Sequence, residues 1–325
     1  MSDECLKCPI SVNITLLSVK AKLKLNKRHY LCVKNNKGLV KKFIFRGLLL
    51  SIVAFAGCID EAPIIEVPET TDNTQASLAV LSEVLSTFDI IQDLTSRNEF
   101  FMKKDASLLP NDVLYIPLDT SYTDGDGIEL LLDFGDLGKT PYGLLCKDEK
   151  YRAGKIKLSL SKPYTEIDAI LKIEFLATHP FYSGDGSVMN KLGGVLSLSR
   201  VSDDEVRLQS SKLTVEKEDV LREVFTDLSI HSIKDNGIGL LNDELSFSGE
   251  ISVTYGELQT TLVTKEPLEK HYTLACAKHI VKGIFDVNQS NSASEIEVDF
   301  DPDNDAACDN KVAILINGKR VMYHY

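Results

Sequence analysis

Lys155–Ser161, with the sequence KIKLSLS, alternates polar and apolar side chains at every position. A period of two places the apolar side chains on one face of a strand and the polar ones on the other. The same alternation recurs in the groups Leu171/Ile173/Phe175, Leu196/Leu198, Leu213/Val215, Leu228/Ile230, Ile251/Val253/Tyr255 and Ile296/Val298/Phe300. Strands with one apolar and one polar face are typical of antiparallel sheets with a solvated face.

Turn signals separate these strands. The clearest is Asn317-Gly318, which lies between the apolar run Val312–Ile316 and the run Lys319–Tyr325 and predicts a two-residue hairpin. The others are DGDG at 124–127, GDG at 184–186 and DNG at 235–237. We therefore predict an all-β domain over residues 105–325, with roughly ten to twelve strands in a mainly antiparallel meander, folded as a sandwich or a long twisted sheet.

Two segments of this domain resemble each other. Leu132-Asp133-Phe134 leads through a loop to Cys146-Lys147-Asp148, and Val298-Asp299-Phe300 leads through a loop to Cys308-Asp309-Asn310. An internal duplication would give the domain two similar halves. Short strand–loop–strand units also converge by chance, so both explanations stay open.

One short amphipathic helix is predicted before the sheet, over residues 75–98. Its apolar positions recur at intervals of three and four residues, at Leu78, Leu81, Leu85, Phe88 and Ile91. Asp72 or Thr74 is a suitable N-cap. Glu83, Asp89 and Asp93 give the helix an acidic polar side, so we expect only one stripe of it to bury against the domain.

The stretch at 41–58, KKFIFRGLLLSIVAFAGC, predicts an export signal. Basic residues precede an apolar core of about ten residues, and Ala56-Gly57 place small side chains before Cys58. The apolar run is too short for a membrane-spanning helix, which needs about 20 residues. The pattern resembles the lipobox of bacterial lipoproteins, which implies that residues 1–57 are removed and that Cys58 is lipidated. The alternative is a buried helix with a chance free cysteine.

Residues 58–74 are predicted to form a flexible tether, since they carry prolines and acidic side chains without periodicity. Asp60 and Glu61 resemble the surface-export signal of Bacteroidota-type lipoproteins. A solvated linker would look the same. We expect an outer-membrane, lipid-anchored protein, and favour display on the cell surface over a periplasm-facing position.

Other motifs extend this resemblance. They are CKDEKYRAGKI at 146–156, the Pro267-Leu268 stretch leading to Cys276, and CDNKVAILINGK at 308–319. With the lipobox and the short helix, they make the chain similar to a family of uncharacterised Bacteroidota-type lipoproteins. The resemblance implies an all-β, lipid-anchored envelope protein and no particular activity.

Three cysteines follow Cys58 in a compartment that permits disulfides. Cys276 and Cys308 flank the last strands, and we predict that they pair. Cys146 would then be a buried free thiol. Pairing of Cys146 with Cys308 is the competing arrangement.

The one candidate cofactor is calcium. Asp299, Asp301, Asp303 and Asp305 alternate through the sequence DFDPDNDAACDN, and Ca²⁺ prefers many oxygen ligands on a flexible loop. A solvated acidic turn explains the same residues. Asp119, Asp124 and Asp126 form a second candidate, in which Gly125 and Gly127 already account for a turn.

No catalytic motif is present: the histidines are scattered, and there is no nucleophile elbow, phosphate-binding loop or dinucleotide fingerprint. Residues 1–46 carry eleven basic and two acidic side chains, and the whole chain has a net charge of −12, so the remainder carries −21. That charge disfavours nucleic acid as a partner. We expect a non-enzymatic β domain that binds a protein or glycan ligand or acts as a scaffold. The alternative is a polysaccharide-binding or polysaccharide-processing accessory lipoprotein, assisted by calcium, although the chain has no Trp to stack on sugar rings.

Overall fold

A computed structural model describes residues 69–95, 108–110, 112–235 and 240–324. The chain divides into two compact units, 1–59 and 60–325, and the described residues all belong to the second. The predicted signal peptide, Cys58 and the first part of the predicted tether lie outside them. Within the described ranges, no helix combines the length and apolar character needed to cross a membrane.

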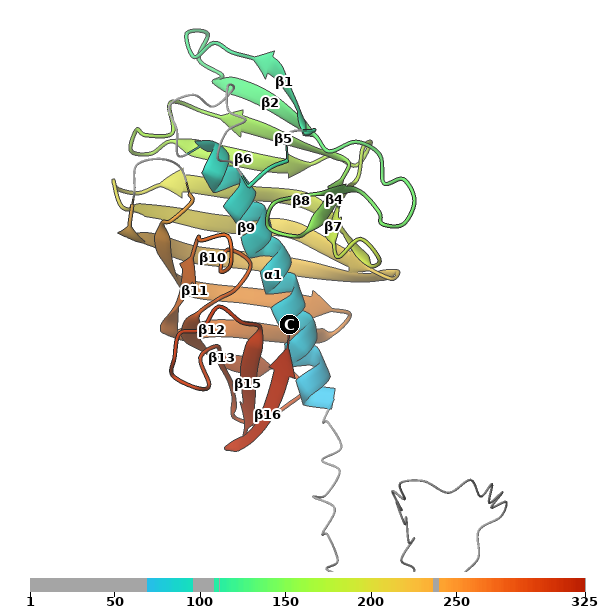
Figure 1. The fold of residues 1–325 in the computed structure, drawn as a ribbon, viewed down its shortest axis with the longest axis vertical. Coiled ribbons are helices and arrows are strands. Elements are labelled where there is room, and N and C mark those ends of the chain that lie inside the picture. The colour runs from blue at the N-terminus through green and yellow to red at the C-terminus, as the bar shows by residue number, and fades with distance from the viewer. Residues whose placement is uncertain (1–68, 96–107, 111, 236–239, 325) are drawn as a thin grey trace, which may run out of the picture. The chain divides into compact units, whose positions relative to one another are not determined.

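The domain is a single antiparallel sheet, which confirms the predicted all-β class (Figure 1). Thirteen strands form a continuous path in which each is hydrogen-bonded to the next. They follow chain order, and the strands missing from the path branch off it. The first six strands of the path are β1 Leu114–Asp119, β2 Ile128–Asp133, β5 Lys155–Leu160, β6 Ile170–Phe175, β8 Met189–Arg200 and β9 Glu205–Lys217. The next seven are β10 Val220–Lys234, β11 Glu244–Tyr255, β12 Leu258–His271, β13 Lys282–Gln289, β14 Ile296–Asp299, β15 Lys311–Ile316 and β16 Lys319–His324.

Three short strands branch from this path. They are β3 Leu144–Leu145, β4 Tyr151–Ala153 and β7 Phe181–Gly184, and they connect through β7 to β8. The described residues therefore contain sixteen strands, so the predicted ten to twelve was too few. The three branching strands are only two to four residues long, and alternation cannot be recognised over so short a run. The path alone, with thirteen strands, already exceeds the predicted number.

The alternation seen in the sequence sets the two faces of the sheet. In β5, every second residue from Ile156 is buried, and the residues between them are partly exposed. Leu158 lies opposite Leu130 on one side and Ile173 on the other, and Ile173 lies opposite Leu196, so buried side chains line up across neighbouring strands. We call this apolar side the inner face and the opposite side the outer face.

The hairpin predicted at Asn317-Gly318 is confirmed. Ile316 pairs with Lys319 at the turn between β15 and β16. Asn317 and Gly318 have φ angles of 49° and 77°, and the tight two-residue turn requires this left-handed conformation at both positions. Asparagine and glycine adopt it at the lowest cost.

Helix α1, Glu69–Thr95, lies along the inner face and crosses the strands (Figure 1). It begins at Glu69, inside the predicted tether rather than at residue 75. Side-chain contacts hold the extra turn in place: Thr71 and Thr74 are buried, and Gln289 of β13 donates to the Thr74 hydroxyl at 3.0 Å. Residues 96–98 of the predicted helix lie outside the described residues.

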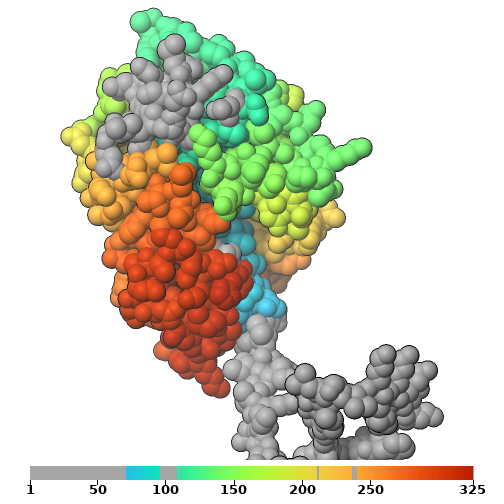
Figure 2. Space-filling view, viewed as in Figure 1, coloured from blue at the N-terminus to red at the C-terminus, as the bar shows by residue number. Residues whose placement is uncertain are grey.

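The expectation that α1 buries only one stripe was wrong. Glu83, Asp89 and Asp93, the predicted polar side, are all less than 6 % exposed. The space-filling view shows only part of α1, in blue, between the green N-terminal and the red C-terminal parts of the domain (Figure 2). The sheet covers one side of the helix, and the turn between β3 and β4 contacts it with Asp148 and Lys150.

Cys276 and Cys308 form the disulfide-bonded pair that the sequence predicted. Their Cα atoms are 4.8 Å apart, and the pair joins the segment after β12 to the segment before β15. The competing pair of Cys146 with Cys308 is not formed, and Cys146 is a buried free thiol.

Reduction of this disulfide should destabilise the domain. The two cysteines are 32 residues apart, and in the chain-entropy treatment a loop of that size contributes about 4 kcal/mol. We expect a reductant to lower the urea midpoint of the wild-type protein. A Cys276→Ser/Cys308→Ser variant should show the low midpoint with and without reductant. Equal midpoints for oxidised and reduced wild-type protein would contradict this prediction.

Candidate functional site

Two regions of the domain concentrate polar side chains: a buried ionic network along α1, and the outer face of the sheet. The network begins at Glu83, whose carboxylate accepts hydrogen bonds from Lys150 at 2.9 Å and from Asn190 of β8 at 3.0 Å. Burial alone would raise the pKa of Glu83, but the charge and hydrogen bond of Lys150 outweigh it, so the pKa lies below its usual range. Glu83 therefore connects the helix to the β3–β4 turn and to β8.

A second part of the network is the ion pair between Asp148 and Arg152. The guanidinium of Arg152 donates to both oxygens of Asp148, at 2.7 and 2.5 Å, and also to the hydroxyl of Ser86 on α1. Arg152 is fully buried. Burial opposes ionisation of Asp148, but the facing guanidinium holds the pKa of that carboxyl below its usual range. This pair fixes β4 and the turn before it against the middle of the helix.

The third part joins α1 to the end of β12. Asp89 accepts hydrogen bonds from Lys270 at 2.5 Å and from the hydroxyl of Tyr272 at 2.6 Å. Further along the helix, Asp93 accepts from the backbone N–H of Leu108 at 2.7 Å. The acidic side of α1 is thus paired with groups from four separate segments of the chain. Such pairing is what allows charged side chains to be buried.

One signal for these partners is present in the sequence around the end of β12. Leu268, Lys270 and Tyr272 follow one another at a period of two, and all three are buried. A lysine at a strand position that shares its face with buried apolar residues indicates a buried cation and hence an acidic partner. The carboxylate that pairs with Lys270 lies 181 residues away in the sequence. The alternation of residues within a strand does not identify so distant a partner.

The outer face carries two connected hollows. The first has a volume of about 450 Å³ and is lined by residues of β9 to β12, among them Arg207, Asp227 and Glu250. The second has a volume of about 760 Å³ and is lined by β12 to β15, with Lys265 and Asn288 in its wall. Val263 contributes to both. Together they form a depression lined by charged, polar and apolar side chains, which we call the outer groove, across the middle and the C-terminal half of the sheet.

Ion pairs dominate the outer groove. Arg207 donates two hydrogen bonds of 2.7 Å to Asp227, and Lys265 pairs with Glu297 and, at 3.9 Å, with Asp286. Both basic side chains are therefore already paired. The further carboxylates that line the groove are Glu205, Glu250 and Glu295. The groove is acidic overall, so it favours a polar or basic ligand.

In the part of the chain that the structure describes, the large exposed aromatic side chains do not form a sugar-stacking platform. Among the described residues, the large exposed aromatic side chains are Tyr122, Phe225 and Tyr255. Phe225 lies opposite Ser252 in β11, and Tyr255 is three residues further along that strand. Because side chains alternate between faces, Phe225 and Tyr255 point to opposite sides of the sheet. Stacking of pyranose rings on adjacent aromatic faces has no basis in this arrangement.

The four aspartates predicted as calcium ligands do not converge. Asp299 and Asp301 accept hydrogen bonds from backbone N–H groups of their own loop, and Asp303 pairs with Lys311 at 3.0 Å. Asp305 likewise accepts from the backbone of Ala307. Contacts of this kind also occur in a solvated acidic turn.

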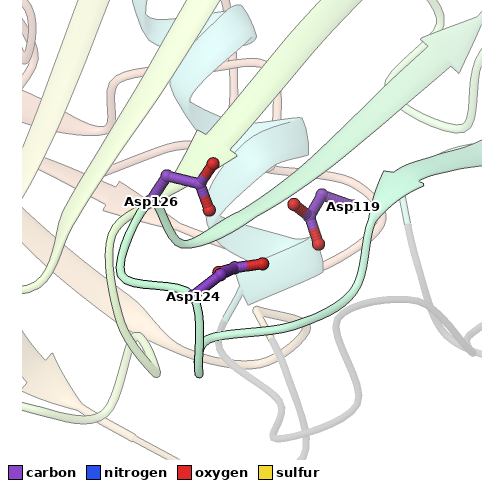
Figure 3. A group of neighbouring side chains, drawn as sticks. All are labelled: Asp119, Asp124 and Asp126. Carbon is purple, nitrogen blue, oxygen red and sulfur yellow. The ribbon is translucent and has the colours of Figure 1, made fainter.

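Among the described residues, one set of three carboxylates is close enough to share an ion. It is the second candidate, Asp119, Asp124 and Asp126 (Figure 3). One oxygen of each lies within 4.8 Å of the others; Asp119 ends β1, and Asp124 and Asp126 lie in the loop between β1 and β2. The hydrogen bond that protonated Asp126 donates to Asp124, together with the repulsion between the two carboxylates, raises the pKa of Asp126. Asp124 and Asp126 are exposed, and exposed acidic groups of this kind are common without a metal.

Cys146 has the properties of a structural cysteine. Burial raises the pKa of its thiol, so the reactive thiolate is disfavoured at neutral pH.

Comparison of the chain with protein-family models, curated protein sequences and solved structures gave no match. A function must therefore be argued from the surfaces described above.

Proposed function

We propose that the protein is a lipid-anchored cell-envelope protein whose β domain binds a partner or serves as a scaffold, without catalysing a reaction. The lipobox-like sequence ending at Cys58 supports the anchor. In this proposal the acylated cysteine holds the chain on the outer membrane, with display on the cell surface favoured, and residues between Cys58 and Glu69 connect it to α1.

The binding function is supported by the difference between the two faces of the sheet: α1 covers the inner face, and the outer face is left open. Helix α1 occupies the inner face, where its side chains are buried and paired. The outer face presents the outer groove, with polar side chains and carboxylates from several strands. An extended polar surface of this kind suits a protein partner with basic side chains better than a small apolar molecule, which requires an enclosed apolar pocket.

Site-specific photocrosslinking in intact cells tests this function. A photoreactive amino acid placed at Asn288, an exposed residue in the wall of the outer groove, should form a covalent adduct of discrete mass. The matched control is the same amino acid at Glu257, an exposed residue in the turn between β11 and β12. Adducts from Asn288 alone would support a binding function of the groove. Equal yields at both positions, or none at either, would contradict it.

A further inference from the structure

Lys270 and Asp89 form an ion pair that is isolated from solvent. Their side chains are 4 % and 3 % exposed, and the ammonium nitrogen lies 2.5 Å from one carboxylate oxygen. Lys150 and Glu83, the other lysine–carboxylate pair on α1, differ in this respect because the side chain of Lys150 is 20 % exposed. Bulk solvent therefore reaches the charge of Lys150 more readily than that of Lys270.

Tyr272 completes the arrangement around Asp89. Its hydroxyl donates to the second carboxylate oxygen at 2.6 Å, and the whole residue is buried. Burial and the nearby carboxylate keep the pKa of Tyr272 well above its usual range, so the hydroxyl remains a donor. One oxygen of Asp89 thus faces an amine and the other faces a fixed O–H group.

Burial disfavours the charged form of Asp89. Burial raises the pKa of Asp89 above its usual range despite the facing ammonium. Lys270 supplies an amine nitrogen and Asp89 a carboxyl carbon, and joining them would remove two buried charges from a medium of low polarity. These are the two reactants of amide formation, held in contact by a packed helix and strand.

We propose that Lys270 and Asp89 condense to an amide bond that covalently links α1 to β12. The side-chain nitrogen of neutral Lys270 attacks Cγ of protonated Asp89, and a C–N bond forms. The Tyr272 hydroxyl stabilises the developing charge on the oxygen to which it donates. The other oxygen takes a proton from the attacking nitrogen and leaves, so one water molecule is released for each amide and no oxidant or reductant is needed.

The structure also provides space for the leaving water. A small cavity of about 20 Å³ lies beside the pair, lined by Asp89, Lys270, Asp148 and Ser86. This volume is enough for one water molecule, and its polar lining supplies hydrogen-bond partners. Contact between reacting groups that are held in place lowers the barrier by replacing an encounter in solution with a step inside one molecule.

Peptide mapping of the purified full-length chain tests the proposal. After reduction of the disulfide and digestion, we expect a branched peptide that joins the Asp89 segment to the Lys270 segment, with a mass one water below the sum of the two. Lys270→Arg keeps the charge but should abolish the branched peptide, whereas Lys150→Arg should retain it. Tyr272→Phe should slow its formation at least tenfold after refolding.

The wild-type result decides the proposal even if a variant fails to fold. Recovery of both segments only as separate linear peptides, from protein that has been folded for days, would overturn it. So would a deficit of one water that maps to another pair of residues. The inference is independent of the proposed binding function, because it concerns a bond inside the domain.

Discussion

Replacing Arg152 with methionine should destabilise the domain by about 3–5 kcal/mol, the usual cost of leaving one partner of a buried ion pair alone. Arg152 is fully buried and satisfies both oxygens of Asp148. Without the guanidinium, Asp148 must either remain as an unpaired buried charge or take up a proton. Urea unfolding followed by circular dichroism would measure the loss at neutral pH.

Two variants separate the buried charge from other effects of the substitution. In Arg152→Met/Asp148→Leu both charges are removed, so much of the lost stability should return. Arg207→Met breaks an exposed pair with Asp227 and should leave the urea midpoint nearly unchanged. If the double variant were no more stable than Arg152→Met, the loss would come from packing rather than from the unpaired carboxylate.

Substitution of Phe88 by alanine should cost about 3–5 kcal/mol, the range for large-to-small changes at buried aromatic positions. Phe88 is fully buried, and its ring meets that of Phe247 edge to face, with 5.7 Å between the ring centres. The contact joins α1 to β11 at the centre of the inner face. A cavity there cannot close without movement of the whole helix.

Phe225→Ala is the matched control for this substitution. Phe225 is 43 % exposed on the outer face, so its removal should change the free energy of unfolding far less than that of Phe88. Both variants can be measured by urea unfolding under identical conditions. Similar losses for the two would contradict the assignment of inner and outer faces.

The architecture could be predicted because it depends on short-range patterns. Alternation in segments such as Lys155–Ser161 identifies an antiparallel strand with one buried face, and Asn317-Gly318 identifies a hairpin from two residues. The pairing of Cys276 with Cys308 followed from their positions beside the last strands. Each of these inferences uses residues close together in the sequence or a small number of alternatives.

The environment of α1 could not be predicted in the same way. Asp89 looks like a solvent-facing residue in its own helix, because the lysine that neutralises it is 181 residues away. Glu83 likewise depends on Lys150, which lies 67 residues further on. Local patterns therefore predicted a polar side in water, whereas the fold brings cations to that side and buries it.

Both proposals give the helix a central part in the protein. In the proposed function, α1 follows the tether directly and connects the lipid anchor to the sheet. Its buried ion pairs and its contact with Phe247 would transmit any force on the anchor to the strands that form the outer groove. An amide between Asp89 and Lys270 would make that connection covalent.

The most direct test of the account is metabolic labelling of the protein with a clickable palmitate analogue, followed by separation of membrane and soluble fractions. We predict that the wild-type chain carries the label and stays with membranes, and that Cys58→Ser loses both properties. Cys146→Ala, which removes a buried thiol, should behave like the wild type. A wild-type chain without label, or a Cys58→Ser variant that retains it, would contradict the lipid-anchored envelope protein proposed here.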